Sequence, residues 1–72
     1  MNREERMEWC KKRALQYVDI GDIPQAITSM LSDLGSHPET INHPGIELGF
    51  MLLMAGQLKT QEEARRFING FN

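Results

Sequence analysis

The sequence predicts an all-α protein: a compact bundle of about four short helices, arranged as two helix hairpins in one domain over residues 1–72. Three observations support this fold class. Apolar residues recur every three or four positions along most of the chain, and residue types that cap helices stand at matching intervals. No stretch shows the alternation of apolar and polar residues that is typical of a β-strand.

The first predicted helix runs from about residue 2 to Asp19. Asn2 and Glu5 have the spacing of a capping pair, in which each side chain binds a free backbone amide of the other residue. A tight turn at residues 21–22 then separates this helix from the second. The apolar face of the first helix is expected to comprise Met7, Cys10, Ala14, Tyr17 and Val18.

The second predicted helix has the clearest amphipathic pattern in the chain. Asp22 can cap its first turn, and Pro24 is tolerated there because the first amides of a helix lack partners. Gly35 can adopt the left-handed conformation that ends many helices. Its buried face is expected to comprise Ile23, Ala26, Ile27, Met30, Leu31 and Leu34.

The third predicted helix follows a loop over residues 35–44 and runs from Pro44 to about Gly56. Gly49 within it costs about 1 kcal/mol relative to alanine, which indicates that another helix crosses there at close range. Apolar side chains surround it almost completely, so it must lie at the centre of the core or be covered by another subunit. These side chains are Ile46, Leu48, Phe50, Met51, Leu52, Leu53, Met54 and Ala55.

The fourth predicted helix begins at a capping box formed by Thr60 and Glu63 and ends at Gly70. Its inner face is expected to comprise Ala64, Phe67, Ile68 and Phe71.

Composition argues against several classes of protein. Eight Lys and Arg against ten Asp and Glu give a net charge of −2, which disfavours a dedicated nucleic-acid domain. The longest apolar run, residues 50–55, is far shorter than the roughly 20 residues that cross a bilayer, so no membrane role is expected. The single cysteine cannot form an internal disulfide, so we expect a cytoplasmic location.

No group of residues indicates an enzyme, and we expect no cofactor. His37, Glu39 and His43 make only an incomplete metal site, and the proline after each histidine favours a role in capping the loop. Cys10 lies on an apolar face without a base nearby, so it is expected to fill the core. The glycines do not have the spacing of a phosphate-binding loop.

Trp9 departs from the amphipathic pattern of the first helix. It lies away from the apolar face, and its helical neighbours include Arg6, Lys12 and Arg13. An aromatic ring among arginines is typical of a hot spot for protein recognition, while the ring could equally pack against the fourth helix as part of the core. The leading hypothesis is a non-enzymatic interaction module that binds a protein partner through these four residues.

Two alternatives stay open beside this hypothesis. A small nucleic-acid-binding regulator could use the basic clusters 11–13 and 65–66, if both clusters face the same side. Alternatively, a homodimer could bury the apolar third helix. The contacts to nucleic acid would come from Lys11, Lys12, Arg13, Arg65 and Arg66.

Residues 14–38 resemble a single tetratricopeptide repeat. The small, aromatic, turn, small, large and terminating positions of that repeat are occupied by Ala14, Tyr17, Gly21, Ala26, Met30 and Pro38. The resemblance implies packing of the two helices as a hairpin, and a role in protein binding. The second hairpin departs from the pattern, because Gln61 stands where the repeat has a small residue.

Taken whole, the chain also resembles short proteins encoded in tailed-phage and prophage genomes. The resemblance lies in segments such as 3–6, 13–17, 29–34 and 43–49. It implies a small accessory factor in the cytoplasm of an infected bacterium, acting as an adaptor or inhibitor that binds a host or phage protein.

Overall fold

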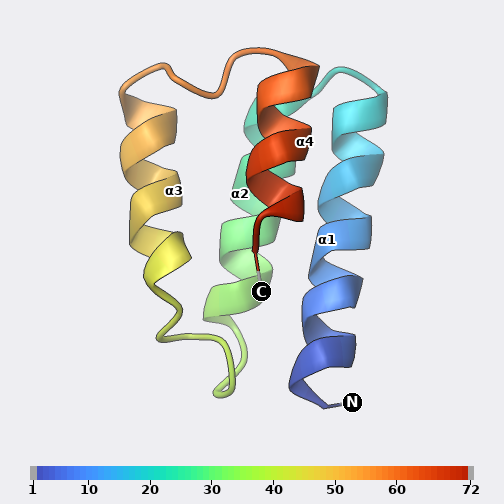
Figure 1. The fold of residues 1–72 in the computed structure, drawn as a ribbon, viewed down its shortest axis with the longest axis vertical. Helices are drawn as coiled ribbons and strands as arrows, with labels where there is room; N and C mark the ends of the chain where they lie inside the picture. The colour runs from blue at the N-terminus through green and yellow to red at the C-terminus, as the bar shows by residue number, and fades with distance from the viewer. Residues whose placement is uncertain (1, 72) are drawn as a thin grey trace.

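The computed structural model describes residues 2–71, which form four α-helices and no strand. The helices run alternately up and down the molecule, and α4 lies in front of α2 and between α1 and α3 (Figure 1). The predicted all-α bundle is therefore confirmed. The helices are α1 (Arg3–Asp19), α2 (Ile23–Gly35), α3 (Pro44–Met54) and α4 (Gln61–Asn69).

The predicted N-terminal caps are all present. Asn2 Oδ1 accepts from the Glu5 amide at 2.8 Å, and Asp22 Oδ1 accepts from the backbone amide three residues further on at 3.3 Å. Thr60 and Glu63 form the reciprocal capping box, with both bonds at 3.1 Å. These contacts satisfy amides that have no partner within the helix, so each helix begins where its cap stands in the sequence.

The predicted left-handed cap at Gly35 is wrong. Gly35 is the last residue of α2, and the capping residue is Ser36, with a φ of −91°. Within residues 2–71 only Gly21 and Gly56 have a positive φ, at 82° and 71°. Glycine permits either hand of backbone at little cost, so its presence near a helix end does not decide which hand is used.

The hydrophobic core lies between α1, α2 and α4. The predicted inner faces of these three helices are confirmed, with Tyr17 and Phe67 only partly buried at its edge. Leu58, in the segment before α4, joins the core as well. The buried apolar residues are Met7, Cys10, Ala14, Val18, Ile23, Ala26, Ile27, Met30, Leu31, Leu34, Leu58, Ala64, Ile68 and Phe71.

The loop between α2 and α3 is anchored by a buried hydroxyl. Thr40 is 1% exposed, and its Oγ1 donates a hydrogen bond of 2.7 Å to the carbonyl oxygen of Leu34. That carbonyl belongs to the last turn of α2 and has no partner within the helix. The contact fixes the loop against the end of α2 and so sets where α3 begins.

Of the two alternatives predicted for α3, the position at the centre of the core is wrong, and cover by another subunit stays a prediction. Among the four helices, α3 has backbone neighbours in α2 alone, and Gly49 is its one buried residue. Four of its large side chains are exposed, by 51% at Leu48, 46% at Phe50, 62% at Met51 and 87% at Met54. The helix contacts the core through Gly49 and through the partly buried Ile46, Leu52 and Leu53, whereas these four side chains lie on its outer side.

The close approach predicted at Gly49 is confirmed. A Cβ on Gly49 would lie 2.7 Å from Leu31 Cδ2 in α2 and 2.9 Å from Phe67 Cζ in α4. Both distances are shorter than a carbon–carbon contact allows, since such contacts are optimal at about 3.5–4.0 Å. Gly49 therefore lets α3 rest directly on side chains of two other helices.

We expect Gly49→Ala to lower the free energy of unfolding by about 1 kcal/mol, because overpacking costs about 1–3 kcal/mol and outweighs the gain in helix propensity. Gly35→Ala is the matched control, since Gly35 is helical and no atom lies within 4 Å of its Cβ position. That variant should gain about 0.5–1 kcal/mol. Urea denaturation measures both, and equal stabilisation by the two substitutions would contradict the packing described for Gly49.

Candidate functional site

Trp9 lies at the surface in the middle of α1, with 36% of its area exposed. The guanidinium carbon of Arg6 lies 5.0 Å from the centroid of the ring, and that of Arg13 lies 4.8 Å from it. Each cation over an aromatic ring at an exposed site contributes about 0.5–1 kcal/mol. The structure thus brings together three of the four residues predicted to bind a partner.

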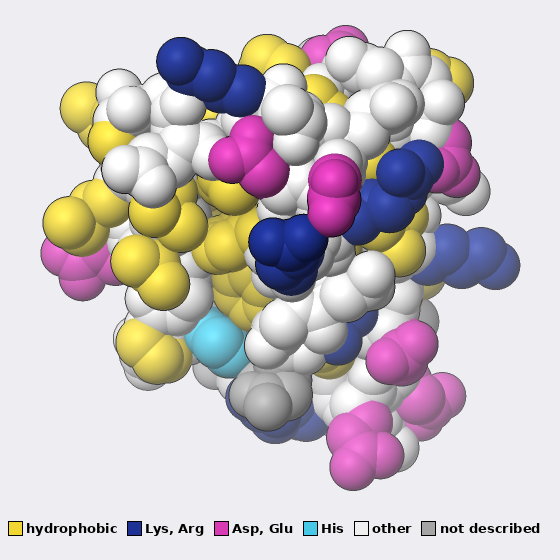
Figure 2. Space-filling view, turned by 45° about the horizontal axis from the view of Figure 1, so that its top comes forward, with side chains coloured by type: hydrophobic (Ala, Val, Ile, Leu, Met, Phe, Trp, Pro, Cys, Tyr) yellow, Lys and Arg dark blue, Asp and Glu magenta, His cyan; other side chains and the backbone are white. Residues whose placement is uncertain are grey.

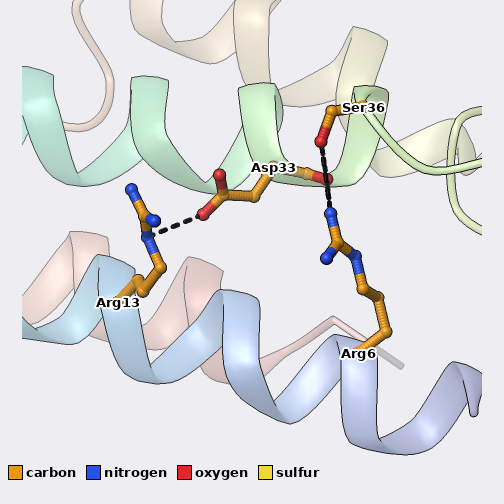
Figure 3. A network of polar contacts seen from close by, with 4 residues as sticks. All are labelled: Arg6, Arg13, Asp33 and Ser36. Carbon is orange, nitrogen blue, oxygen red and sulfur yellow. Dashed lines mark hydrogen bonds and ion pairs between the residues drawn. The ribbon is translucent and has the colours of Figure 1, made fainter. Parts of the chain in front are cut away.

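The two arginines reach from α1 to the last turns of α2 (Figure 3). Arg6 Nη2 donates to the carbonyl oxygen of Asp33 at 3.1 Å and to Ser36 Oγ at 3.2 Å. Arg13 Nε lies 3.1 Å from Asp33 Oδ2, as an ion pair without the alignment of a hydrogen bond. A cation near the C-terminal end of a helix is favoured by the helix dipole and by its free carbonyls. The guanidinium groups beside Trp9 are therefore held in place.

A broad shallow hollow of about 920 Å³ adjoins the ring of Trp9. Lys12, the fourth predicted residue, is exposed and lines it. The hollow contains more acidic than basic side chains, so its charge is negative overall. Its lining residues include four acids, Glu4, Glu5, Glu8 and Asp19, and two bases, Lys11 and Lys12.

The residues predicted to contact nucleic acid do not form one free basic surface. Arg65 pairs with Asp19 at 2.9 Å, and Arg66 pairs with Glu62 at 2.7 Å. Arg13 forms an ion pair with Asp33 of α2, and Arg66 lines a groove between α3 and α4. Within the described chain, only the two lysines of the set, Lys11 and Lys12, have no carboxylate within 4.0 Å.

Both histidines cap turns, as predicted. His37 Nδ1 accepts from the amide of Glu39 at 3.3 Å, and His43 Nδ1 accepts from the amide of Gly45 at 2.9 Å. These bonds hold the two imidazoles in local turns on either side of the loop. Residues 2–71 contain no group of three His, Cys, Asp or Glu side chains arranged to hold a metal ion.

Cys10 fills the core beneath this region, as predicted, and has no exposed surface. Burial raises the pKa of its thiol, and the negative charge of Asp33 raises it further. The charges of Arg6 and Arg13 act in the opposite direction. The thiol therefore stays protonated at neutral pH and is a poor nucleophile, since the thiolate is the reactive form.

Sequence reasoning missed the groups that hold the site together. Asp33 and Ser36 stand 27 and 30 residues from Arg6, and no local spacing links them to it. It also missed an apolar groove between α3 and α4. Two hollows of about 420 and 270 Å³ form this groove and share Arg66 and Phe67, while Leu48 and Phe71 line the larger one.

Comparison of the chain with protein-family models, with curated proteins and with solved structures gives no significant match. Within residues 2–71, the helices are each too short or too polar to span a lipid bilayer.

The pKa of the Cys10 thiol should depend on the charge of Asp33. We expect Asp33→Asn to lower its pKa toward the ordinary value of 9.0, because one of the two causes that raise it is removed. The ¹³Cβ chemical shift of Cys10 measured against pH gives this pKa, with Asp19→Asn as a control that should leave it unchanged. Folding raises the pKa of the Cys10 thiol above 9.0. The contribution of this thiol to the free energy of unfolding is therefore complete below pH 9.0 and declines as the pH rises above that value. A thiol pKa that Asp33→Asn does not move would contradict the arrangement.

Proposed function

We propose that the protein is a non-enzymatic protein-interaction module, which binds a protein partner through Trp9 and the side chains around it, Arg6, Lys12 and Arg13. The observation that carries the proposal is the position of Trp9. The residue is 36% exposed, and two guanidinium groups that contact α2 lie within 5.0 Å of the centroid of its ring. Tryptophan and arginine are the residues most enriched at the energetic centres of interfaces.

The fixed arginines support binding because they reduce its entropic cost. A rotamer-rich side chain that becomes immobile in an interface costs about 0.5–1.5 kcal/mol. Arg6 and Arg13 are already restrained by Asp33 and Ser36, and their stacking restrains the ring of Trp9. A partner would therefore meet a surface that needs little further ordering.

The charges around the ring indicate the chemistry of the partner. The hollow beside Trp9 is acidic overall, and Glu5 and Glu8 lie within it. A partner segment that places an apolar side chain on the ring and basic side chains beside Glu5 and Glu8, away from Arg6 and Arg13, would complement this surface. We propose that such a segment belongs to a host or phage protein, on which this chain acts as an adaptor or inhibitor in the bacterial cytoplasm.

The alternative of a nucleic-acid-binding regulator has less support. Arg13, Arg65 and Arg66 are each paired with a carboxylate, and the hollow that contains Lys11 and Lys12 carries more negative than positive charge. Binding to phosphates would have to displace those carboxylates.

Trp9→Ala tests the proposed function. We expect capture of a partner from bacterial lysate to fall about 30-fold, which corresponds to the roughly 2 kcal/mol of a hot-spot residue. The fold should survive, since two cation–π contacts contribute only about 1–2 kcal/mol together. Helical content and the melting curve by circular dichroism check that point.

Ile20→Ala is the matched control, because Ile20 is 76% exposed at the other end of α1 and should not affect capture. Equal capture by Trp9→Ala and the unmodified chain would contradict the proposal, as would a melt showing that Trp9→Ala is largely unfolded.

A further inference from the structure

The outer side of α3 carries large apolar side chains that stay about half exposed or more within residues 2–71. We call this surface the α3 face and define it by Leu48, Phe50, Met51 and Met54, all of them 46% exposed or more. In Figure 2 the apolar side chains gather over α3 and the adjoining groove, whereas charged side chains are scattered over the rest of that view. The helix α3 lies on the opposite side of the molecule from α1, the helix that carries Trp9 (Figure 1).

The size of the α3 face fits a modest interface. The four side chains expose roughly 500 Å², and two such surfaces in contact would bury about 1,000 Å², near the lower limit for a specific protein interface. Removal of this apolar surface from water favours association and opposes the cost of the lost translational and rotational freedom. The groove beside Leu48 extends the apolar surface through Phe67 and Phe71. Its one charged lining residue, Arg66, is paired with Glu62.

The charges around the α3 face favour a second copy of this chain as its occupant. Residues 44–58 contain a single charged side chain, that of Glu47 in the first turn of α3. A symmetric dimer brings the same surface of both copies together, so that surface must carry no unbalanced charge. The four side chains of the α3 face satisfy this condition because none of them is charged.

The positions of Glu47 and Lys59 indicate the orientation of the pair. Lys59 folds back over the C-terminal end of α3, where its Nζ would lie 3.6 Å from a Cβ on Gly56. Parallel helices would place the two Glu47 carboxylates side by side, which is unfavourable. Antiparallel helices would instead bring each Glu47 to the end of α3 where the Lys59 of the other copy lies.

We propose that two copies of this chain form a symmetric dimer through the α3 face, with the two α3 helices antiparallel and each Glu47 beside Lys59 of the other copy. The proposal does not depend on the proposed function, because the dimer leaves Trp9 and α1 uncovered.

Sedimentation equilibrium over a range of concentrations tests the dimer directly. The average mass should rise with concentration from 8.3 kDa toward twice that value. Met51→Asp, at the middle of the α3 face, should weaken association at least tenfold and leave the helical content unchanged, since Met51 is exposed in the monomer. Ile20→Asp is the matched control and should associate like the unmodified chain. A mass of 8.3 kDa at every concentration, or equal weakening by both variants, would overturn the proposal.

Exchange of the two charges tests the orientation. Glu47→Lys and Lys59→Glu should each weaken the dimer at low salt, because each places like charges together. The double variant should restore association to that of the unmodified chain. If the double variant is as weak as the single ones, or if neither single variant weakens the dimer, the antiparallel arrangement is wrong.

Discussion

The packing of α2 against all three other helices is the constraint on which the rest of the structure depends. Ile27, Met30 and Leu34 have no exposed surface, and Leu31 has almost none. The apolar face of α2 is wide enough that α1 and α4 together do not cover it, and the remaining side receives α3. Because α1 and α4 fill the core, α3 packs at its edge through Gly49, Ile46, Leu52 and Leu53. Its other large side chains, Leu48, Phe50, Met51 and Met54, stay exposed.

The same packing gives the molecule two unlike surfaces. On α1, contacts to the last turn of α2 hold Arg6 and Arg13 beside an exposed ring within acidic surroundings. On α3, the surface is apolar and almost uncharged. The first is the proposed binding site for a protein partner, and the second is the surface of the proposed dimer. A dimer through α3 would display two copies of the α1 surface on its outer sides, which would raise the avidity for a partner with repeated sites.

What the sequence predicts correctly here depends on local spacing. The caps at Asn2 and Thr60 bind amides three residues away, and the arginines beside Trp9 lie three and four residues from it. The errors and omissions involve choices made in three dimensions. The apolar pattern of α3 does not reveal that α4 would occupy the core in its place, and the contact of Arg6 with Asp33 crosses 27 residues without a local signal. Most of the fold and the arginines beside Trp9 could therefore be predicted, whereas their contacts with Asp33 and Ser36 at the end of α2 could not.

Native-state hydrogen exchange measured by NMR tests the central role of α2 most directly. The experiment uses the Met51→Asp variant at low concentration, so that α3 is not covered by a second copy of the chain. The account predicts that amides in the middle of α2 exchange only through global unfolding, while amides of α3 open at a free energy about 2 kcal/mol lower, since α3 can detach while the core stays formed. Equal protection of α3 and α2, or faster exchange in α2 than in α3, would contradict it.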